Sequence, residues 1–341
     1  MIFEYSISKI FGYFVSKRNK RYDNGKILPY KCSIPVISIG NLSVGGTGKT
    51  PFVQMIAREL MNTGKKPAII GLGYKRQGRG ELIISDGEKI FADVTQCGDE
   101  MLLLANSINV PIVVHEQKYK AAQVVESNFQ VDCIIVDDAF QHRMLGRNLD
   151  IVLIDNQTIN NPYLLPKGRL REPLSAISRA DVICLAEDVE AERETFPKIK
   201  ENSLLIRSRI ISEKPYNLLT NAVLSNEEYS LVKVNMITVS AIANPQRFTA
   251  MLKKSEINFA YTFQFNDHHN YRITDINKII KIAKSSGINY IGTTEKDGTK
   301  LVKFKEQFTN YGLELIVFPI SLQISEGKEL FLKRILEVFL I

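Results

Sequence analysis

Hydrophobic and polar positions follow two patterns that alternate along most of this chain. Short apolar runs, typical of buried strands, are separated by longer segments with apolar residues three or four positions apart, typical of amphipathic helices. In the first half, strands are expected at residues 36–39, 67–72, 110–114, 134–136, 151–154 and 182–185, and helices at 49–61, 100–107 and 117–128. This order predicts a parallel sheet covered by helices on both faces.

A second domain is expected after residues 203–235, where the alternation of strands and helices is interrupted. The break contains two segments that are predicted to be extended, 204–211 and 231–234. The alternation then resumes, with strands at 236–240, 259–265, 290–293 and 314–319 and helices at 245–254, 274–285 and from 326 onward. A chain of 341 residues is long enough for about two domains. We therefore predict two α/β domains, at 22–205 and 236–341, joined by a β linker at 206–235.

The first 21 residues predict an amphipathic helix. Apolar residues at positions 3, 7, 10 or 11, and 14 fall at helical spacing, and a basic cluster lies at 17–21. Such a helix can lie in a membrane interface that carries anionic lipid. It can equally pack on its own domain with its charges in water, and the residues alone leave both interpretations open. No apolar run reaches the roughly 18–20 residues that a membrane-spanning helix needs.

Composition places the chain among ordinary globular proteins, because 45% of its residues are hydrophobic and 24% are charged. The excess of 44 lysines and arginines over 37 acidic residues gives +7, which permits an anionic partner but identifies none. Basic patches interleaved with aromatic residues are not evident, so a nucleic-acid partner is not expected. Four cysteines without a CxxC pair argue against a zinc site or a disulfide framework and fit a reducing cytoplasm.

The strongest chemical signal is a glycine-rich turn between the strand at 36–39 and the helix at 49–61. Gly45, Gly46 and Gly48 let backbone N–H groups point at phosphate oxygens, and the helix that follows adds the positive end of its dipole. Lys49 is expected to reach the β- and γ-phosphates of ATP, and the Thr50 hydroxyl to ligate Mg²⁺. The expected nucleotide contacts are Ser43, Val44, Gly45, Gly46, Thr47, Gly48, Lys49 and Thr50.

Two positions depart from the usual patterns of such loops. Ser43 stands where the strict pattern G-x-x-x-x-G-K-[ST] has its first glycine. Val44 stands where dimerising partition and metal-pump ATPases have a signature lysine, which weakens that interpretation without removing it. The strand before the turn, the helix after it and the intact Gly-Lys-Thr still indicate phosphate binding.

Paired carboxylates follow the apolar strand at 134–136. Asp137 and Asp138 are expected at the carboxyl edge of the sheet, beside the phosphate loop, where Mg²⁺ bound to a nucleotide takes one or two carboxylates. Adjacent side chains on an extended segment point to opposite sides, so one of the two is expected to be structural. Which of them touches the metal stays open.

Several motifs in sequence order resemble the tetraacyldisaccharide 4′-kinases of lipid A synthesis. They are GNLSVGGTGKTP at 40–51, Gly73-Tyr74, Gly98-Asp99-Glu100, DDAFQH at 137–142, LLPKGRLREP at 164–173, Asp267-His268-His269 and TEKD at 294–297. The resemblance implies a P-loop NTPase-like α/β/α domain, a short β linker and a second, smaller α/β domain. It implies transfer of the γ-phosphoryl of ATP, with Mg²⁺, to the 4′-hydroxyl of a tetraacyldisaccharide 1-phosphate. It also implies a membrane-associated N-terminal helix, at the cytoplasmic face of the bacterial inner membrane.

Three positions depart from the family pattern. Leu72 stands in place of an arginine, Ala139 in place of a glycine and Arg169 in place of a proline. The first departure removes any substrate contact that the arginine makes. The second is expected to cost little if φ there is negative, and the third adds charge beside Arg171.

A sugar hydroxyl is a poor nucleophile, so a kinase of this kind benefits from a carboxylate that accepts its proton. Asp99, at a loop-to-helix junction, is the candidate, and its alternative role is a helix cap. The resemblance implies that a histidine supports Asp99, and His268 in the second domain is the better candidate of the Asp267-His268-His269 segment. With Lys49 these are the expected catalytic residues, and the active site is then expected between the domains.

Substrate contacts are expected from Tyr74, Glu100 and Arg171. Arg171 is expected to meet a phosphate of the nucleotide or of the substrate, with a surface ion pair to Glu172 as the alternative. The residues at 295–297 either order a loop or touch a ligand.

A second function stays open: a membrane-associated P-loop ATPase that acts as a conformational switch. The phosphate loop and the amphipathic start fit both functions. Asp99, the Asp267-His268-His269 segment and Val44 favour the lipid kinase.

Overall fold

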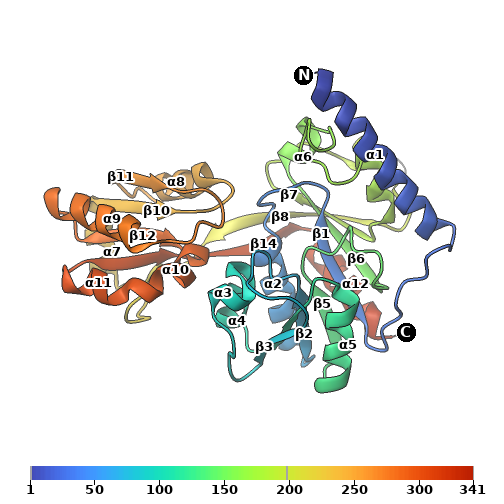
Figure 1. Ribbon diagram of the computed structural model, residues 1–341, viewed down its shortest axis with the longest axis horizontal. Coiled ribbons are helices and arrows are strands. Elements are labelled where there is room, and N and C mark those ends of the chain that lie inside the picture. The colour runs from blue at the N-terminus through green and yellow to red at the C-terminus, as the bar shows by residue number, and fades with distance from the viewer. Residues whose placement is uncertain (1, 197–198, 341) are drawn as a thin grey trace.

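The molecule contains two sheets side by side, each between layers of helices (Figure 1). The structure is a computed structural model that describes residues 2–196 and 199–340. Residue 1 of the expected N-terminal helix, residues 197 and 198 of the expected first domain, and residue 341 lie outside the described residues. The expected α/β class is confirmed by the mainly parallel pairing within both sheets.

In the part of the chain that the structure describes, the larger sheet has nine strands in the order β14-β8-β7-β6-β1-β5-β2-β4-β3. They are β1 (Val36–Asn41), β2 (Pro67–Gly71), β3 (Leu82–Asp86), β4 (Pro111–Val114), β5 (Cys133–Val136), β6 (Leu149–Ile154), β7 (Val182–Ala186), β8 (Leu204–Ser212) and β14 (Ile320–Glu326). The edge strands β3 and β14 run antiparallel to their neighbours. The strands between them are parallel, so their carboxyl ends meet at one edge of the sheet.

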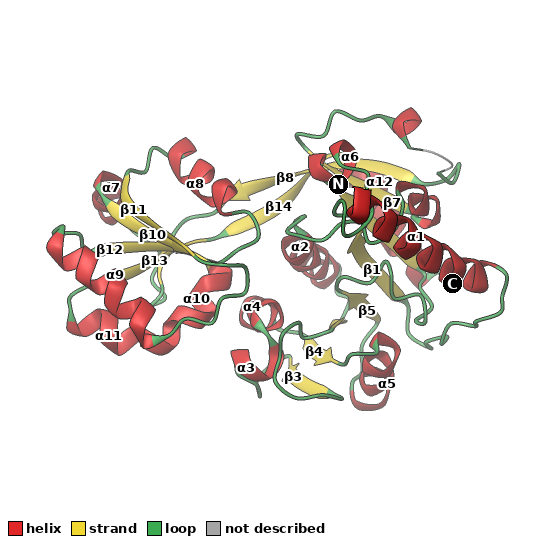
Figure 2. Ribbon diagram, turned by 45° about the horizontal axis from the view of Figure 1, so that its top comes forward, coloured by secondary structure: helices red, strands yellow, loops and turns green. Residues whose placement is uncertain are grey.

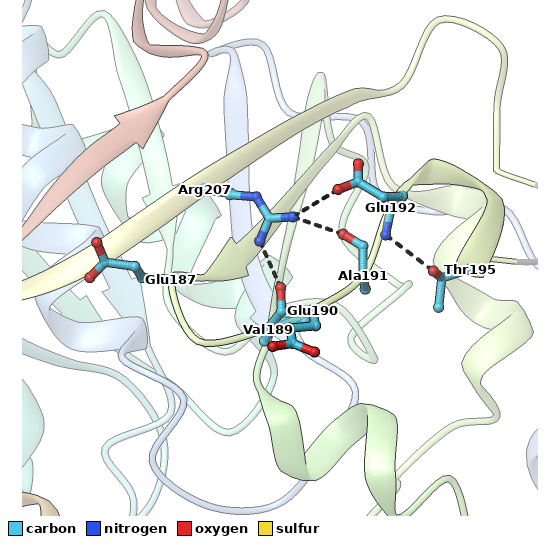
Figure 3. Close-up of a pocket in the computed structure, with 7 residues that line it drawn as sticks. All are labelled: Glu187, Val189, Glu190, Ala191, Glu192, Thr195 and Arg207. Atoms are coloured by element: carbon cyan, nitrogen blue, oxygen red, sulfur yellow. Dashed lines mark hydrogen bonds and ion pairs between the residues drawn. The ribbon is translucent and has the colours of Figure 1, made fainter.

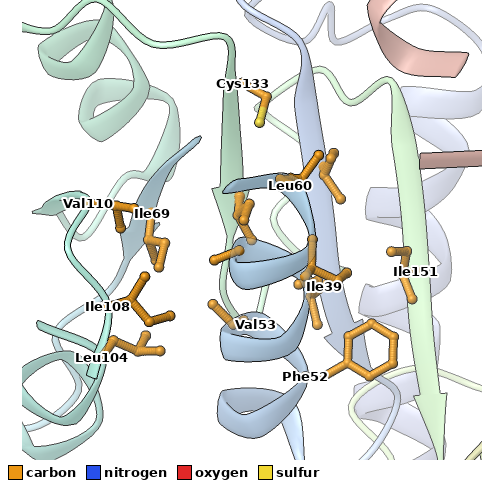
Figure 4. Close-up of a cluster of buried hydrophobic side chains, with 14 of the residues drawn as sticks. Ile39, Phe52, Val53, Leu60, Ile69, Leu104, Ile108, Val110, Cys133 and Ile151 are labelled. Carbon is orange, nitrogen blue, oxygen red and sulfur yellow. The ribbon is translucent and has the colours of Figure 1, made fainter. Parts of the chain in front are cut away.

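Helices cover both faces of this sheet, because its central strands are apolar on both sides. One face carries α2 (Lys49–Asn62), α4 (Asp99–Ser107) and α12 (Lys328–Leu336), and the other carries α5 (Lys118–Asn128) and the 3-10 helix η1 (Leu174–Arg179). The short helices α3 (Val94–Cys97) and α6 (Asn156–Asn160) lie in loops. Figure 4 shows Phe52, Val53 and Leu60 of α2 packed against Ile39 and Ile151, all of them buried.

The smaller sheet has five strands within the described residues, in the order β11-β10-β12-β13-β9. They are β9 (Tyr216–Asn217), β10 (Met236–Ser240), β11 (Phe259–Gln264), β12 (Tyr290–Thr294) and β13 (Glu314–Phe318). One face is covered by α9 (Ile273–Ser285), α10 (Glu295–Leu301) and α11 (Lys305–Asn310), and the other by α7 (Asn226–Val234) and α8 (Pro245–Lys254).

The two sheets are connected by β8 and β14, which pair antiparallel and extend from the larger sheet toward the smaller one (Figure 2). This differs from the division expected from sequence, which assigns 206–235 to a linker and 236–341 to one domain. β14 is not among the expected strands, although Leu322 and Ile324 alternate with polar residues and are buried in the core of the larger sheet. After β14, α12 packs Phe331 and Ile335 into the same core.

The segment at 231–234 is helical, so the expectation of an extended segment is wrong. It lies in α7, which starts with a capping box between Ser225 and Glu228. The Ser225 hydroxyl accepts the Glu228 N–H, and the Glu228 carboxylate accepts the Ser225 N–H. This S-x-x-E signal decides the local structure more strongly than the short apolar run that follows it.

The N-terminal helix α1 (Ile2–Asp23) packs one side against the larger domain (Figure 1). Ser8 and Val15 are buried, and the Ser8 hydroxyl donates to the Leu164 carbonyl and accepts the Lys167 N–H. On the other side, large apolar side chains are exposed, among them Phe3, Ile10, Tyr13 and Phe14. None of the helices formed by residues 2–196 and 199–340 has both the length and the apolar character to cross a membrane.

Candidate active site between the two domains

The glycine-rich turn lies between β1 and α2, at the carboxyl edge of the larger sheet. Gly45 and Gly48 have φ values of 117° and 85°, which glycine adopts without steric cost. The Asn41 side chain donates to the Thr47 hydroxyl at 2.9 Å and closes the turn. α2 starts at Lys49 with no side chain capping its first N–H groups, which therefore stay available to an anion.

The acidic pair after β5 lies at the same edge. Asp138 has its Oδ1 at 3.5 Å from Lys49 Nζ, and Arg171 Nη1 donates to both of its oxygens at 2.9 and 2.7 Å. Burial acts to raise the pKa of Asp138, but the charges of Lys49, Lys118 and Arg171 outweigh it and lower the pKa below its usual range. Asp138 is therefore an anion held by surrounding cations.

Asp137 lies in a different environment, although it is the next residue. Its side chain is buried, and its Oδ1 has no hydrogen-bond partner among the described residues. Burial and the charges of Glu100 and Asp138 raise the pKa of Asp137. A buried carboxylate oxygen without a partner costs free energy unless a proton or a cation joins it. Asp137 is therefore the member of the pair with a free position for a ligand.

Lys118 fixes the backbone of this pair, and no sequence pattern singled it out. It is buried at the start of α5, and its Nζ donates to the carbonyl oxygens of Asp137 and Asp138. Burial lowers the pKa of Lys118. In the sequence it is one lysine among several polar residues at a helix start, so only the tertiary structure reveals this contact.

Asp99 and His268 meet across the two domains. Asp99 is the first residue of α4, and its carboxylate oxygens lie 2.9 and 3.0 Å from Nδ1 of His268, which is in the loop after β11. Gly98 occupies the N-cap position of α4, so the alternative that Asp99 is the helix cap is wrong. Burial acts to raise the pKa of Asp99, but the hydrogen bond to His268 and the charges of Lys296 and Lys300 outweigh it and lower the pKa to about 2.

Two of the expected substrate contacts lie next to this pair. The Tyr74 ring meets the His268 imidazole edge-on, with centroids 4.9 Å apart, and it is 57% exposed. Glu100 pairs with Lys296 at 3.3 Å, and Lys296 Nζ also lies 3.3 Å from Nε2 of His268. Lys296 therefore lies beside the Asp99–His268 pair.

Arg171 lies with the phosphate loop, and its alternative ion pair with Glu172 is wrong. Glu172 is fully buried, and its carboxylate accepts hydrogen bonds from Arg18 at 2.7 Å and Arg179 at 2.5 Å. Arg171 instead holds Asp138.

Two cavities lie near the larger sheet. One of about 250 Å³ adjoins the acidic pair and is lined in part by Arg18, Lys118 and His142. Burial and nearby cations lower the pKa of His142 to about 3, so this histidine is neutral. The other, of about 450 Å³, lies after β7, and its lining includes Glu187, Thr195 and Arg207 (Figure 3). It contains none of the site residues expected from the sequence.

Comparisons with known proteins cover nearly the whole chain. The family described as tetraacyldisaccharide-1-P 4′-kinase (LpxK) matches residues 2–339. The chain belongs to this family. Tetraacyldisaccharide 4′-kinases of Halothermothrix orenii and Pelodictyon phaeoclathratiforme are 32% identical over 337 residues and 34% identical over 328 residues. The alignments cover 93% of this chain in both cases, and 88% and 91% of those proteins.

A solved structure supports the same assignment. The crystal structure of LpxK from Aquifex aeolicus in complex with ATP superposes with a TM-score of 0.79. Its sequence is 28% identical, and the alignment covers 98% of each chain. The expected family and its P-loop NTPase-like fold are therefore confirmed.

The departures from the LpxK pattern can now be placed. Ala139 does not have a positive φ, because the left-handed residue of this turn is Asp138, with φ 49°. Arg169 contacts the phosphate loop: its Nε and Nη2 donate to the Val44 carbonyl at 3.0 and 2.6 Å. The guanidinium fills the space where a Cβ on Gly45 would lie, and the φ of 117° is the reason that the loop needs glycine at that position.

We expect Arg169→Met to weaken ATP binding by about tenfold, which corresponds to about 1.4 kcal/mol. The reason is that the variant loses charge-assisted hydrogen bonds that hold the phosphate loop, each worth roughly 1.5–3 kcal/mol at most. Isothermal titration calorimetry with ATP measures the change, and Arg334→Met, a substitution on α12 far along the chain from the loop, is the matched control. Equal ATP affinities of Arg169→Met and the wild type would show that these contacts do not order the loop.

Proposed function

We propose that this protein transfers the γ-phosphoryl group of ATP to the 4′-hydroxyl of a tetraacyldisaccharide 1-phosphate, the kinase reaction of lipid A biosynthesis. The observation that carries this function is the pairing of Asp99 with His268 at a domain interface, within a chain of the tetraacyldisaccharide 4′-kinase family. A histidine held by a carboxylate is a proton acceptor, which a hydroxyl nucleophile requires. No contact described above favours the alternative of an ATPase switch.

We infer that His268, rather than Asp99, accepts the proton of the hydroxyl. Both oxygens of Asp99 face Nδ1 of His268, so Nδ1 carries the proton and donates it to the carboxylate. Nε2 is then the atom left to accept the hydroxyl proton. Asp99, with a pKa of about 2, is a weak base, and its role is to orient the imidazole and to stabilise it when it becomes charged.

ATP is expected at the phosphate loop, with Lys49 at its β- and γ-phosphates. The residues at this edge fit Mg²⁺. Asp137 has a buried oxygen without a partner, and Thr50, which carries a hydroxyl, lies in the first turn of α2, directly after the phosphate loop. Asp137 is the better direct ligand, since Lys49 and Arg171 already neutralise Asp138. When bound, Mg²⁺ neutralises charge that develops on the phosphate oxygens.

The lipid disaccharide is expected at the domain interface, with its 4′-hydroxyl at Nε2 of His268. Tyr74 and Glu100 flank this position and are the expected sugar contacts. Arg171 is expected to act on the nucleotide side, because it holds Asp138 at the phosphate loop. Leu72, two residues before Tyr74, offers no charged contact to the substrate.

Transfer of labelled phosphate from ATP to a panel of lipid disaccharides tests the function directly. We expect a product phosphorylated at the 4′-position, and we expect Lys49→Ala to reduce its formation by at least a hundredfold without unfolding the protein. Lys66→Ala, an exposed lysine soon after α2, serves as the control and is expected to keep wild-type activity. ATP hydrolysis that does not depend on lipid and yields no labelled lipid would instead indicate the switch.

The role of His268 predicts a loss of turnover without a loss of binding. His268→Gln is expected to lower kcat by about 10² to 10⁴, the usual contribution of a general base, with little change in KM for ATP. The control is His269→Gln, because His269 pairs with Asp275 and stacks on Phe265 outside the site. Steady-state kinetics at saturating lipid measure both variants, and an unchanged kcat in His268→Gln would exclude this histidine as the acceptor.

The exposed apolar side of α1 is proposed to lie in an anionic membrane surface, on the cytoplasmic side of the inner membrane where ATP is available. Ile10, Tyr13 and Phe14 are between 58% and 63% exposed on this side. Basic residues at 17–21 follow them on the same helix. Burial of such side chains together with attraction to anionic lipid is the usual basis of interfacial binding.

The triple variant Ile10→Ser, Tyr13→Ser, Phe14→Ser is expected to lose at least tenfold in affinity for vesicles that contain phosphatidylglycerol. Activity on detergent-dispersed substrate is expected to persist, because these side chains do not touch the site. Leu231→Ser with Val234→Ser, which removes exposed apolar residues from α7, is the control. Co-sedimentation gives the affinities, and equal binding of the triple variant and the wild type would contradict the membrane role of α1.

A further inference from the structure

Lys300 is a buried lysine that reaches the catalytic pair from α10. Only 4% of its side chain is exposed, and its Nζ lies 3.5 Å from Asp99 Oδ2 and 3.0 Å from Asp297 Oδ1. A buried ammonium costs free energy unless anions surround it. Here the two anions come from different domains, so the lysine bridges the interface at the catalytic carboxylate.

Asp297 anchors this lysine to the core of the smaller domain. Its Oδ2 accepts the Ala241 N–H at 2.9 Å and the Thr294 hydroxyl at 2.8 Å, and its Oδ1 accepts the Tyr271 hydroxyl at 3.1 Å. Both Asp297 and Tyr271 are buried. The ammonium of Lys300 therefore has a fixed position relative to the sheet that carries the His268 loop.

The same ammonium group constrains the rotation of the Asp99 carboxylate. An aspartate has a broad choice of rotation about its last bond unless contacts select one. Lys300 lies on the Oδ2 side of Asp99, while both oxygens face Nδ1 of His268. The selected rotation sets the direction of the imidazole, and with it the direction of Nε2.

Lys296 lies one helical turn earlier and contacts a different part of the site. Its Nζ is 3.3 Å from Glu100, from Asp267 and from Nε2 of His268, on the side where the hydroxyl reacts. It is also less close to Asp99 than Lys300 is, at 3.8 Å. Both lysines attract Asp99, and of the two Lys300 is the one that Asp297 anchors to the core of the smaller domain.

We propose that Lys300 is a positioning residue for phosphoryl transfer: anchored by Asp297, it holds the Asp99 carboxylate and through it the imidazole of His268. This inference rests on the proposed function, in which Nε2 of His268 accepts the hydroxyl proton. It adds that α10 of the smaller domain, through Lys300, positions Asp99 at the start of α4 in the larger domain, and that Asp99 in turn positions His268.

Lys300→Met, which removes the charge and keeps most of the length, is expected to lower kcat by 10- to 100-fold. Small displacements of a catalytic group produce losses of this size. KM for ATP and for the lipid is expected to change by less than threefold, because Lys300 touches neither. Lys300→Arg is expected to recover part of kcat. Lys303→Met, an exposed lysine that donates to Asn270, is the matched control and is expected to keep wild-type kinetics.

A double-mutant cycle with His268→Gln separates positioning from a merely structural role. In that background the group to be positioned is gone, so Lys300→Met is expected to change kcat by less than twofold. A structural role would lower kcat by the same factor in both backgrounds. Thermal unfolding of each variant is measured alongside the kinetics to establish that the variant is folded.

Asp297→Asn gives an independent form of the same test and serves if Lys300→Met does not fold. It keeps the shape of the side chain and weakens the anchor of Lys300, so a several-fold loss of kcat is expected, again absent in the His268→Gln background. Wild-type kcat in the folded variants, or equal losses in both backgrounds, would overturn the positioning role. A wild-type enzyme that does not phosphorylate the lipid would instead contradict the proposed function.

Discussion

Attraction between the acidic start of α4 and the lysines of α10 holds the two halves of the site in contact. Asp99 and Glu100 occupy the first turn of α4, where the helix dipole favours negative charge, and Lys300 occupies the last turn of α10, where it favours positive charge. The start of α4 and Lys300 therefore each carry the charge that their own helix end stabilises, whereas Lys296 lies in the first turn of α10 and has no such support. Because these groups are largely buried, solvent screens them little, and the position of His268 depends on them.

Backbone conformation adds a second constraint around the same place. Among the described residues, five that are not glycine have a positive φ, and three of them, Lys75, Asp138 and His268, lie in or beside the site. Such left-handed residues cost on the order of 1–3 kcal/mol each and persist only when surrounding contacts hold them. Lys118 supplies such contacts at the acidic pair through two carbonyl oxygens. The site is thus a strained arrangement supported by buried cations.

The sequence predicted local features well, because each depends on neighbouring residues. The glycine turn before Lys49, the acidic pair after β5 and the α/β order all follow from short patterns. Contacts between distant residues leave no such pattern. Lys118 and Lys300 look like ordinary helix lysines, and their importance arises only when a fold brings carbonyls or carboxylates to them. β14 was missed although Leu322 and Ile324 alternate with polar residues, and no local pattern shows that the chain returns there to pair with β8, more than a hundred residues earlier.

The return of the chain to the larger sheet through β14 and α12 has a consequence for biosynthesis. The smaller sheet is complete once β13 has been made, whereas the larger sheet, begun much earlier, still lacks an edge strand and the Phe331 side chain of its core. The order in which the domains are finished is therefore the reverse of the order in which they start. During translation the larger sheet therefore keeps an open edge at β8 until residues 320–336, which follow the strands of the smaller sheet, have been made.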